Sequence, residues 1–391
     1  MTDREPAAHR DESALTAEGA ATLAPLTGIR FVAAILVFNA HLVPPAGAPA
    51  VVSGFALAGH DWMTMFFVLS GLILTWNYDR LLTEKGTRGL RIYYVARFAR
   101  IYPLYLLTLA VAVLVMVHQP ADIGRLLTDP ALWLHVVAQQ TWSGDLSVAY
   151  GFNGPAWSVG VELFLYALFP LLLIPLRRIR RNVRALLIVC VAAVLVVAAL
   201  TVLSYLLGIA DLPHENPLSG HRLLYRTPIT RLPDFVLGVC LGYLLMATRD
   251  RDLTGIGRIF QAVGGVLVIG EMLIPQLAAS MWSLDSTDMV PFALLLFGLA
   301  VSPGTVLARL LSSGPMVLLG DSSYAFYLWH QTVVTLVGRS GPSATAWAVA
   351  WVVAFVVTTA VAVGTHVLFE VPARRWLRRV LGPRTPAPVR A

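Results

Sequence analysis

The chain has 391 residues, of which 57% are hydrophobic and only 13% are charged. Soluble domains carry about 25% charged residues, so this composition excludes an ordinary soluble enzyme and indicates that much apolar surface faces lipid. The two cysteines lie in apolar segments, which excludes a disulfide framework and a cysteine metal site. The 29 Lys and Arg residues exceed the 22 Asp and Glu, but they form short clusters between apolar segments, a pattern typical of a membrane protein's cytoplasmic side rather than of nucleic-acid binding.

The first 22 residues are polar, carry both signs of charge and predict a disordered cytoplasmic tail. The apolar segment 23–43 ends at Pro44-Pro45 before a run of small residues, an arrangement similar to a signal peptide and its cleavage site. Because Arg30 interrupts the segment and the tail is acidic as well as basic, we interpret it as an uncleaved first membrane span.

Ten apolar segments are interpreted as membrane spans. They lie at residues 23–43, 62–78, 101–117, 157–176, 185–207, 229–246, 259–278, 290–301, 317–337 and 345–369. The segment 131–140 covers only about 15 Å as a helix, so it predicts a short interfacial or re-entrant helix. The expected fold is therefore an all-α polytopic membrane bundle, with one transmembrane domain at 23–373 and a basic cytoplasmic tail at 374–391.

Arginine clusters predict the topology of this bundle. Residues 79–100, 177–184 and 374–391 carry the strongest clusters and are expected in the cytoplasm. The connection 44–61 has no Lys or Arg, and the connection 209–227 is mixed in charge, so both are expected outside. An even number of crossings separates the first two clusters, which leaves 131–140 out of the count and places both termini in the cytoplasm.

The first span contains two charged or titratable residues, Arg30 and His41. A charge inside hydrocarbon costs at least ~2.5–3.5 kcal/mol on insertion scales, so each is a functional candidate. Eleven positions of helix come within about 20° of three full turns and rise roughly 16 Å, so the two side chains share one face at different depths. In the alternative interpretation, Arg30 reaches the cytoplasmic surface and His41 caps the helix at the outer surface.

A polar stripe opens the span at 157–176. Pro155 favours a helix start, and Ser158, Glu162 and Tyr166 follow at four-residue spacing. A carboxylate two turns inside a membrane helix needs a partner, and the depth of His41 makes that residue a candidate partner for Glu162. The alternative is a structural hydrogen bond between helices.

Two further groups permit a structural or a functional interpretation. Arg91, Arg97 and Arg100 gather before the third span, where they either anchor the cytoplasmic side or clamp phosphate groups through their planar guanidinium forks. Ser70 and Gly71 lie in the middle of the second span, where small residues favour close packing of helices.

The later spans contain further polar candidates. Arg231 and Asp234 are three residues apart and can pair along a helix, which is the favoured interpretation. Tyr327 and His330 share a helical face, and for His330 a structural role is favoured over a functional one. Glu370, beside several arginines, is expected to be architectural. The residues retained as candidate substrate-binding groups are Ser158, Tyr166, Arg231, Asp234, Tyr327 and His330.

Together these segments resemble the membrane acyltransferase-3 family, which includes sugar O-acetylases of bacterial surface glycans and acyltransferases of macrolide biosynthesis. The resemblance covers about Leu26 to Arg375. It rests on Leu26-Thr-Gly-Ile-Arg30 with His41 eleven residues later, Phe66-Phe-Val-Leu-Ser-Gly71, Arg97-Phe-Ala-Arg100-Ile-Tyr-Pro103, Trp157-Ser-Val-Gly-Val-Glu162, Arg231-Leu-Pro-Asp-Phe-Val-Leu-Gly238, Ser323-Tyr-Ala-Phe-Tyr-Leu-Trp-His330 and Glu370-Val-Pro. Each motif is weak alone, but their order and depth make the set specific.

The resemblance implies that Arg30, His41, Arg97 and Arg100 take part in activity. Two departures stand out: Asp234 lies where the family often has Glu, and the hydrolase-like domain fused to some members is not found in this sequence. Since that domain often accompanies glycan modification, the acceptor stays open between a surface glycan and a glycosylated natural product such as a macrolide. A multi-pass protein of the plasma membrane is expected.

The residues suit acyl transfer from acyl-CoA, as cosubstrate, to a sugar hydroxyl. Histidine has an unperturbed pKa of about 6.5, so we expect His41 to act as the base, oriented by Glu162, or as the nucleophile. Arg30, Arg97 and Arg100 would hold the nucleotide phosphates. No tightly bound cofactor, no metal and no nucleic-acid partner is expected. The competing hypothesis is a proton-coupled secondary transporter, although matching inverted halves are not evident in the sequence.

Overall fold

A computed structural model describes residues 6–45, 47–57, 59, 62–117, 120–274, 277, 280–284, 286–338 and 343–383. Every element in these ranges is a helix, which confirms the predicted all-α fold. Five helical stretches are long and apolar enough to cross a membrane: Gly86–Met116, Gly154–Ile179, Val183–Leu206, Thr254–Met272 and Ala344–Leu381. Shorter apolar helices at Leu23–Asn39, Leu232–Ala247 and Met289–Val301 coincide with three more predicted spans, while the full count of about ten stays a prediction.

The helices follow the apolar segments of the sequence closely. In chain order the elements are α1 (Pro6–Asn39), α2 (Ala50–Leu57), α3 (Trp62–Glu84), α4 (Gly86–Met116), α5 (Pro120–Thr128), α6 (Pro130–Val136), η2 (Gln140–Trp142), α7 (Leu146–Ala149), η3 (Gly154–Ala156), α8 (Trp157–Ile179), α9 (Val183–Leu206), η4 (His221–Arg226), α10 (Leu232–Ala247), α11 (Thr254–Met272), α13 (Met289–Val301), α14 (Val306–Leu311), α15 (Gly314–Asp321), α16 (Ser323–Val337), α17 (Ala344–Thr365), η5 (His366–Glu370) and α18 (Val371–Leu381). Residues 131–140 contain α6 and the start of η2 rather than a spanning helix.

The two ends of the chain differ from the sequence-based expectation. Helix α1 begins at Pro6 and so includes residues 6–22, while their assignment to a separate disordered cytoplasmic tail stays a prediction. The alanine content of this segment favours helix, which the polar composition concealed. At the other end, the predicted boundary at 373/374 falls inside α18. Residues 1–5 and 384–391 of the predicted tails lie outside the described residues, as do parts of the predicted 44–61 connection and of the span 259–278.

Glycines set two close helix contacts that hold the bundle together. A side chain at Gly71 of α3 would come within 2.2 Å of the Phe235 carbonyl oxygen in α10, and one at Gly238 within 1.9 Å of the Val68 carbonyl oxygen in α3. The predicted packing role of Gly71 is therefore confirmed. Similarly, a side chain at Gly28 of α1 would meet the Leu311 carbonyl oxygen at 2.0 Å. That contact fixes where α1 packs against α14.

A buried ion pair ties three helices together beside this packing. Asp79 of α3, only 5% exposed, accepts hydrogen bonds from Arg177 Nε of α8 at 2.6 Å and from the Tyr243 hydroxyl of α10 at 2.8 Å. Arg180 lies 3.5 Å from the second carboxylate oxygen. The carboxylate is thus compensated by charge and hydrogen bonds inside the bundle.

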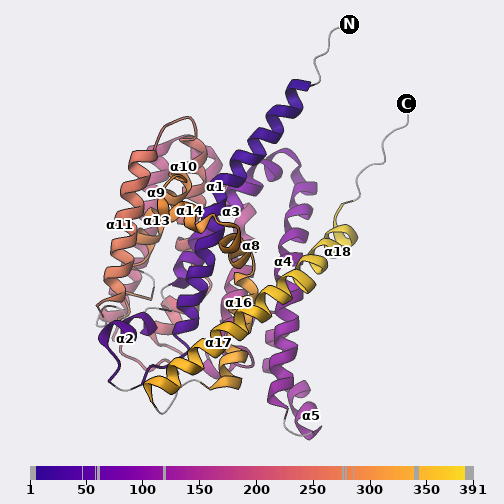
Figure 1. Ribbon diagram of the computed structural model, residues 1–391, viewed down its shortest axis with the longest axis vertical. Coiled ribbons are helices and arrows are strands. Elements are labelled where there is room, and N and C mark those ends of the chain that lie inside the picture. Colours follow the sequence, from indigo (N-terminus) through magenta and orange to yellow (C-terminus); the bar gives the residue numbers. More distant parts are fainter. Residues whose placement is uncertain are drawn as a thin grey trace.

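The arrangement of α1, α3, α8 and α16 matters most for function. Helix α1 contacts both α3 and α16, and α3 contacts α8. Figure 1 shows α1 and α18 directed toward the same end of the molecule, while α2 and α5 lie at the opposite end. Arg30 lies within α1 and His41 lies two residues beyond its end at Asn39, so the two residues lie toward opposite halves of the bundle.

Candidate active site

Two cavities follow one another along α1. The first, of about 480 Å³, is here called the arginine cavity, and the second, of about 500 Å³, the histidine cavity. The arginine cavity is lined by Arg30, Arg97, Arg100, Glu162, Tyr166 and Ser323, among others. The histidine cavity is lined by His41, Tyr150, Trp157, His214, His221 and Tyr225, among others. Met63 and Tyr327 line both, so these two side chains separate the cavities.

Arg97 is held by aromatic residues in the wall of the arginine cavity. Its Nη2 donates a hydrogen bond to the Tyr78 hydroxyl at 2.8 Å, and its guanidinium carbon lies 4.9 Å from the Tyr78 ring centroid and 5.8 Å from that of Tyr166. Its Nε is buried and finds no acceptor among the described residues. A cation stacked on aromatic faces, with one donor left over, is well suited to bind an anion.

Arg30 and Arg100 complete the positive charge of this cavity. Both line it, Arg30 from α1 and Arg100 from α4, and each is within electrostatic range of the other. Asp321 and Glu162 are the carboxylates within range of Arg30. The predicted gathering of Arg30, Arg97 and Arg100 is therefore seen in the structure, although they belong to helices separated by some 70 residues.

Glu162 belongs to the arginine cavity and not to the cavity that contains His41. Its carboxylate accepts a short hydrogen bond from the hydroxyl of Tyr166, one turn later on α8. The hydroxyl of Tyr166 also lies 3.4 Å from that of Ser70. The expected pairing of Glu162 with His41 is corrected by this arrangement: similar depth in the membrane did not imply the same position around the bundle.

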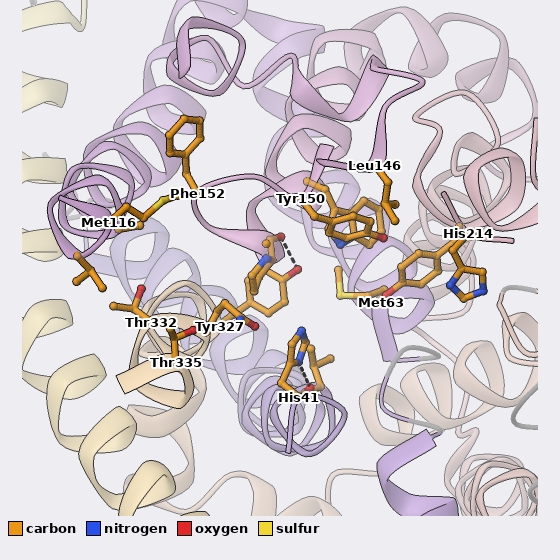
Figure 2. A pocket seen from close by; sticks show the side chains of 18 of the residues that line it. His41, Met63, Met116, Leu146, Tyr150, Phe152, His214, Tyr327, Thr332 and Thr335 are labelled. Atoms are coloured by element: carbon orange, nitrogen blue, oxygen red, sulfur yellow. Dashed lines mark hydrogen bonds between the residues drawn. The ribbon is translucent and has the colours of Figure 1, made fainter. Parts of the chain in front are cut away.

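His330 of α16 is the side chain that meets His41. Nε2 of His330 and Nδ1 of His41 are 3.3 Å apart, and the ring centroids are separated by 4.7 Å. His330 is fully buried, while His41 lines the cavity and points toward the space between Tyr327 and Met63 (Figure 2). The sequence motif identified both histidines, but only the fold brings together residues 289 positions apart.

The hydrogen bonds determine which ring nitrogen carries a proton in the neutral pair. Nδ1 of His330 is 2.6 Å from the Tyr327 carbonyl oxygen, which only accepts, so this nitrogen donates and Nε2 carries the lone pair. Nδ1 of His41 is 3.0 Å from the Val37 carbonyl oxygen and must also donate, its proton shared toward Nε2 of His330. The basic lone pair of neutral His41 is consequently on Nε2.

Polar groups at the junction of the cavities hold Tyr327 in place. The Tyr327 hydroxyl donates to the Pro155 carbonyl oxygen at 2.7 Å and accepts from the Ser158 hydroxyl at 2.9 Å. Ser158 lines the arginine cavity. The structure therefore brings together three candidates, Ser158, Tyr327 and His330, but it gives Ser158 and Tyr327 fixed structural contacts.

Aromatic residues from connecting segments form the wall of the histidine cavity opposite His41 (Figure 2). The rings of His214 and His221 stack at 4.1 Å with 13° between their planes. Tyr225 is on the same short π-helix η4 as His221, and its ring centroid lies 4.7 Å from that of Trp157. Sequence reasoning missed these residues, because loop and π-helical positions show no period of 2 or 3.6 that would place them on a common face.

The comparisons with known proteins agree with this geometry. A family model described as an acyltransferase domain, acyltransferase-3, matches residues 24–367. The chain belongs to the acyltransferase-3 family. Members of this family are integral membrane proteins, in agreement with the long apolar helices. No solved structure shows a significant match to the chain.

Several curated acyltransferases are similar to this acyltransferase-3 chain. Acyltransferase MdmB of Streptomyces mycarofaciens is 30% identical over 382 residues, which cover 93% of this chain and 94% of that protein. Peptidoglycan O-acetyltransferase OatA of Listeria monocytogenes is 24% identical over 329 residues, and O-acetyltransferase OatA of Staphylococcus aureus is 25% identical over 339. Each OatA match covers 80% of this chain but only 49% and 50% of the two relatives, respectively.

Arg231 and Asp234 of the acyltransferase-3 motif lie inside the bundle, away from both cavities. Both side chains are fully buried, with Nη1 of Arg231 3.2 Å from the Asp234 carboxylate, and neither lines either cavity. Arg231 also donates to the Tyr225 carbonyl oxygen at 2.7 Å and to the Leu284 carbonyl oxygen at 2.7 Å. The favoured interpretation as an ion pair is confirmed, and the candidate substrate contact is not found. The pair instead fixes Tyr225 in the cavity wall.

The side chains that line the two cavities determine what this site can bind. Among the described residues, no group of three or more His, Cys, Asp or Glu side chains lies close enough to hold a metal ion. The polar groups that line the two cavities are arginines, histidines, hydroxyls, the amides of Asn77 and Gln331, and the carboxylates of Glu162 and Asp321. These residues can bind an anion at one end and move a proton at the other.

Proposed function

We propose that the protein is a multi-pass O-acyltransferase of the plasma membrane that transfers an acyl group from acyl-CoA to a hydroxyl group of a sugar. The observation that carries the proposal is the meeting of two unlike cavities at Met63 and Tyr327. One cavity has the charge needed to bind phosphates, and the other has a histidine whose tautomer leaves a basic nitrogen. Transfer of an acyl group requires the donor and the acceptor to meet at one point, and the two cavities meet at these side chains.

The arginine cavity suits the donor. Coenzyme A carries several phosphate groups at its nucleotide end, and arginine binds phosphate oxygens through two parallel hydrogen bonds. The buried Nε of Arg97 offers one donor for such a bond. From Arg30 to its end at Asn39, two residues before His41, helix α1 rises by roughly 14 Å, a distance that an extended pantetheine arm can cover with its thioester toward Tyr327.

The histidine pair suits the chemical step. Nε2 of His41 accepts the proton of the acceptor hydroxyl as the oxygen attacks the thioester carbonyl carbon. The tetrahedral intermediate collapses, the carbon–sulfur bond breaks, and the leaving thiolate takes the proton from His41. His330 does not contact the substrates in this scheme. Its Nε2 accepts a hydrogen bond from the Nδ1–H of His41, which keeps its proton, and so steadies the imidazolium that forms between the two proton transfers.

The histidine cavity suits the acceptor. Its wall of Tyr150, Trp157, His221 and Tyr225 offers flat faces on which the apolar side of a sugar ring can pack, and an apolar wall with few polar groups is typical of ligand pockets. The names of the OatA relatives, which state O-acetylation, support an oxygen acceptor. The full-length similarity to acyltransferase MdmB supports the same class of reaction in a chain of this size.

Consumption of the thioester tests the proposal against transport. Purified protein in nanodiscs, given acetyl-CoA and a panel of nitrophenyl glycosides, should release free thiol and produce an acetylated glycoside detectable by mass spectrometry. A proton-coupled transporter would release no thiol under these conditions. Absence of thiol release across acetyl-, propionyl- and longer acyl-CoA donors would refute the proposed function.

The orientation in the membrane forms part of the same proposal. The arginine clusters favour a cytoplasmic position for both termini and for 177–184, which is the side where acyl-CoA is made. The start of α1 and the end of α18 are directed toward the same end of the molecule, which supports this orientation (Figure 1). A reporter fused after Arg184 should report the cytoplasm, and labelling of that site by impermeant reagents from outside would contradict it.

A further inference from the structure

A basic helix beyond the last long apolar helix lies against the donor side of the molecule. Helix α18 follows α17 and η5 and packs on α4 (Figure 1). Nε of Arg91 in α4 donates to the carbonyl oxygen of Leu381, the last residue of α18, at 3.3 Å. This end of α18 is therefore attached to the same helix that carries Arg97 and Arg100.

The arginines of α18 divide into two pairs. Arg374 and Arg378 are one turn apart, and both are within electrostatic range of Arg100; Arg378 is also within range of Arg97. Arg375 and Arg379 are each one position later, about 100° further around the helix; Arg374 is half-buried, and the other three arginines are exposed. Helical geometry thus turns one pair toward the arginine cavity and the other away from it.

The positive charge that results exceeds the nearby negative charge. Arg30, Arg97, Arg100, Arg374 and Arg378 form one group linked through Arg100. Glu162, Asp321 and Glu370 are the carboxylates within range of members of this group. Of these, Glu162 accepts from Tyr166, and Glu370 is 2.9 Å from Nδ1 of His366.

Like charges gathered in a partly buried region repel one another, and a bound anion removes that repulsion. The buried Nε of Arg97, which lacks an acceptor among the described residues, independently points to a ligand on this side. Arg374 and Arg378 do not line the cavity itself, so they would contact the outermost part of a molecule that extends into it.

We propose that Arg374 and Arg378 bind the 3′-phosphate of the donor's ribose, outside the arginine cavity, while Arg97 and Arg100 bind the diphosphate. This inference rests on the proposed function, in which the pantetheine arm enters the cavity first. The 3′-phosphate lies at the opposite end of coenzyme A from the thiol and is therefore the group that stays nearest to α18. Helix α18 accordingly selects coenzyme A over carriers that lack this phosphate.

The test compares coenzyme A with 3′-dephospho-coenzyme A by calorimetry, using the full chain in nanodiscs of zwitterionic lipid. The wild-type protein should bind coenzyme A about ten- to a hundredfold more tightly. The Arg374→Gln/Arg378→Gln variant should bind coenzyme A more weakly and leave the affinity for the dephospho form unchanged, so that the preference disappears. The Arg375→Gln/Arg379→Gln variant removes the same net charge and should keep the preference.

Several results would overturn the inference. Equal wild-type affinity for the two ligands does so without any substitution, and therefore without concern for folding. Equal loss of preference in the Arg375→Gln/Arg379→Gln variant would indicate a general effect of charge. An effect of Arg374→Gln/Arg378→Gln that appears only in phosphatidylglycerol discs would assign the pair to lipid headgroups. If the wild-type protein binds neither ligand and releases no thiol, the proposed function itself fails; equal binding with normal turnover refutes only the role of α18.

Discussion

The arginine cavity and the histidine cavity have similar volumes, about 480 and 500 Å³, but different construction. The arginines come from the long helices α1 and α4, held in position by the packing of the bundle. The wall that faces His41 comes largely from short elements, including the end of α7, η3 and η4. Connecting segments change more readily than packed helices, so under the proposed function we expect the acceptor side to vary more among relatives than the donor side.

The strongest test of this division is the replacement of His41. His41→Ala should reduce turnover by about 10²–10⁴-fold, because it removes the base from the chemical step. Affinity for coenzyme A should stay at the wild-type value, since the arginine cavity is unaltered. Single-turnover kinetics and calorimetry measure the two quantities, and near-normal turnover in this variant would remove His41 from the mechanism.

Loss of the donor arginines should produce the opposite pattern. Arg97→Ala and Arg100→Ala should each weaken acyl-CoA binding by about ten- to a hundredfold, as each removes a charge-assisted contact, while kcat at saturating donor changes less. Arg88→Ala is the matched control, because Arg88 is an exposed arginine on the same helix α4. Unchanged donor affinity in the double variant would leave these residues as cytoplasmic anchors only.

Replacement of His330 should have a smaller effect than replacement of His41. His330→Ala removes one hydrogen bond to the base, which corresponds to about a two- to tenfold loss in kcat. If His330 steadies the imidazolium of His41, its removal makes His41 harder to protonate, so the acid limb of the kcat/KM profile should shift to lower pH in this variant, whereas a purely structural role would leave it in place. His330→Gln, which keeps an acceptor, should recover part of the activity. A loss as large as that of His41→Ala would make His330 the reactive histidine.

Glu162→Gln should change the donor side slightly. The amide keeps an acceptor for Tyr166 but removes a negative charge near Arg30, so affinity for acyl-CoA should rise by about two- to tenfold. The turnover rate and its pH profile should be retained. A large fall in kcat with a displaced profile would restore the earlier hypothesis that this carboxylate orients His41.

Much of the fold could be predicted from apolar segments, because a helix that faces lipid must be apolar over its length. The packing role of Gly71 and the pairing of Arg231 with Asp234 also followed from local spacing. The helix at residues 6–22 was harder to predict, since these residues are polar but also favourable for helix.

The site was only half predictable. Helical spacing predicted that Arg30 and His41 lie at different depths, and they line different cavities, although α1 ends at Asn39 and His41 follows in a turn. The partners of His41 and Glu162 depend on how α1, α8 and α16 are arranged around the bundle, and sequence position gives depth but not direction. His214, His221 and Tyr225 belong to connections whose paths are set by tertiary contacts, such as the bond of Arg231 to the Tyr225 carbonyl oxygen.

The wall formed by Met63 and Tyr327 has a consequence for the cell as well as for the reaction. Under the proposed orientation, in which the arginine cavity faces the cytoplasm, loss of both side chains would join the two cavities into one continuous path along which protons could move. Tyr327 is anchored to Pro155 and Ser158 by its hydroxyl, so the barrier is tethered rather than loose. In the proposed reaction, the tyrosine that borders the thioester would therefore also keep the two cavities apart.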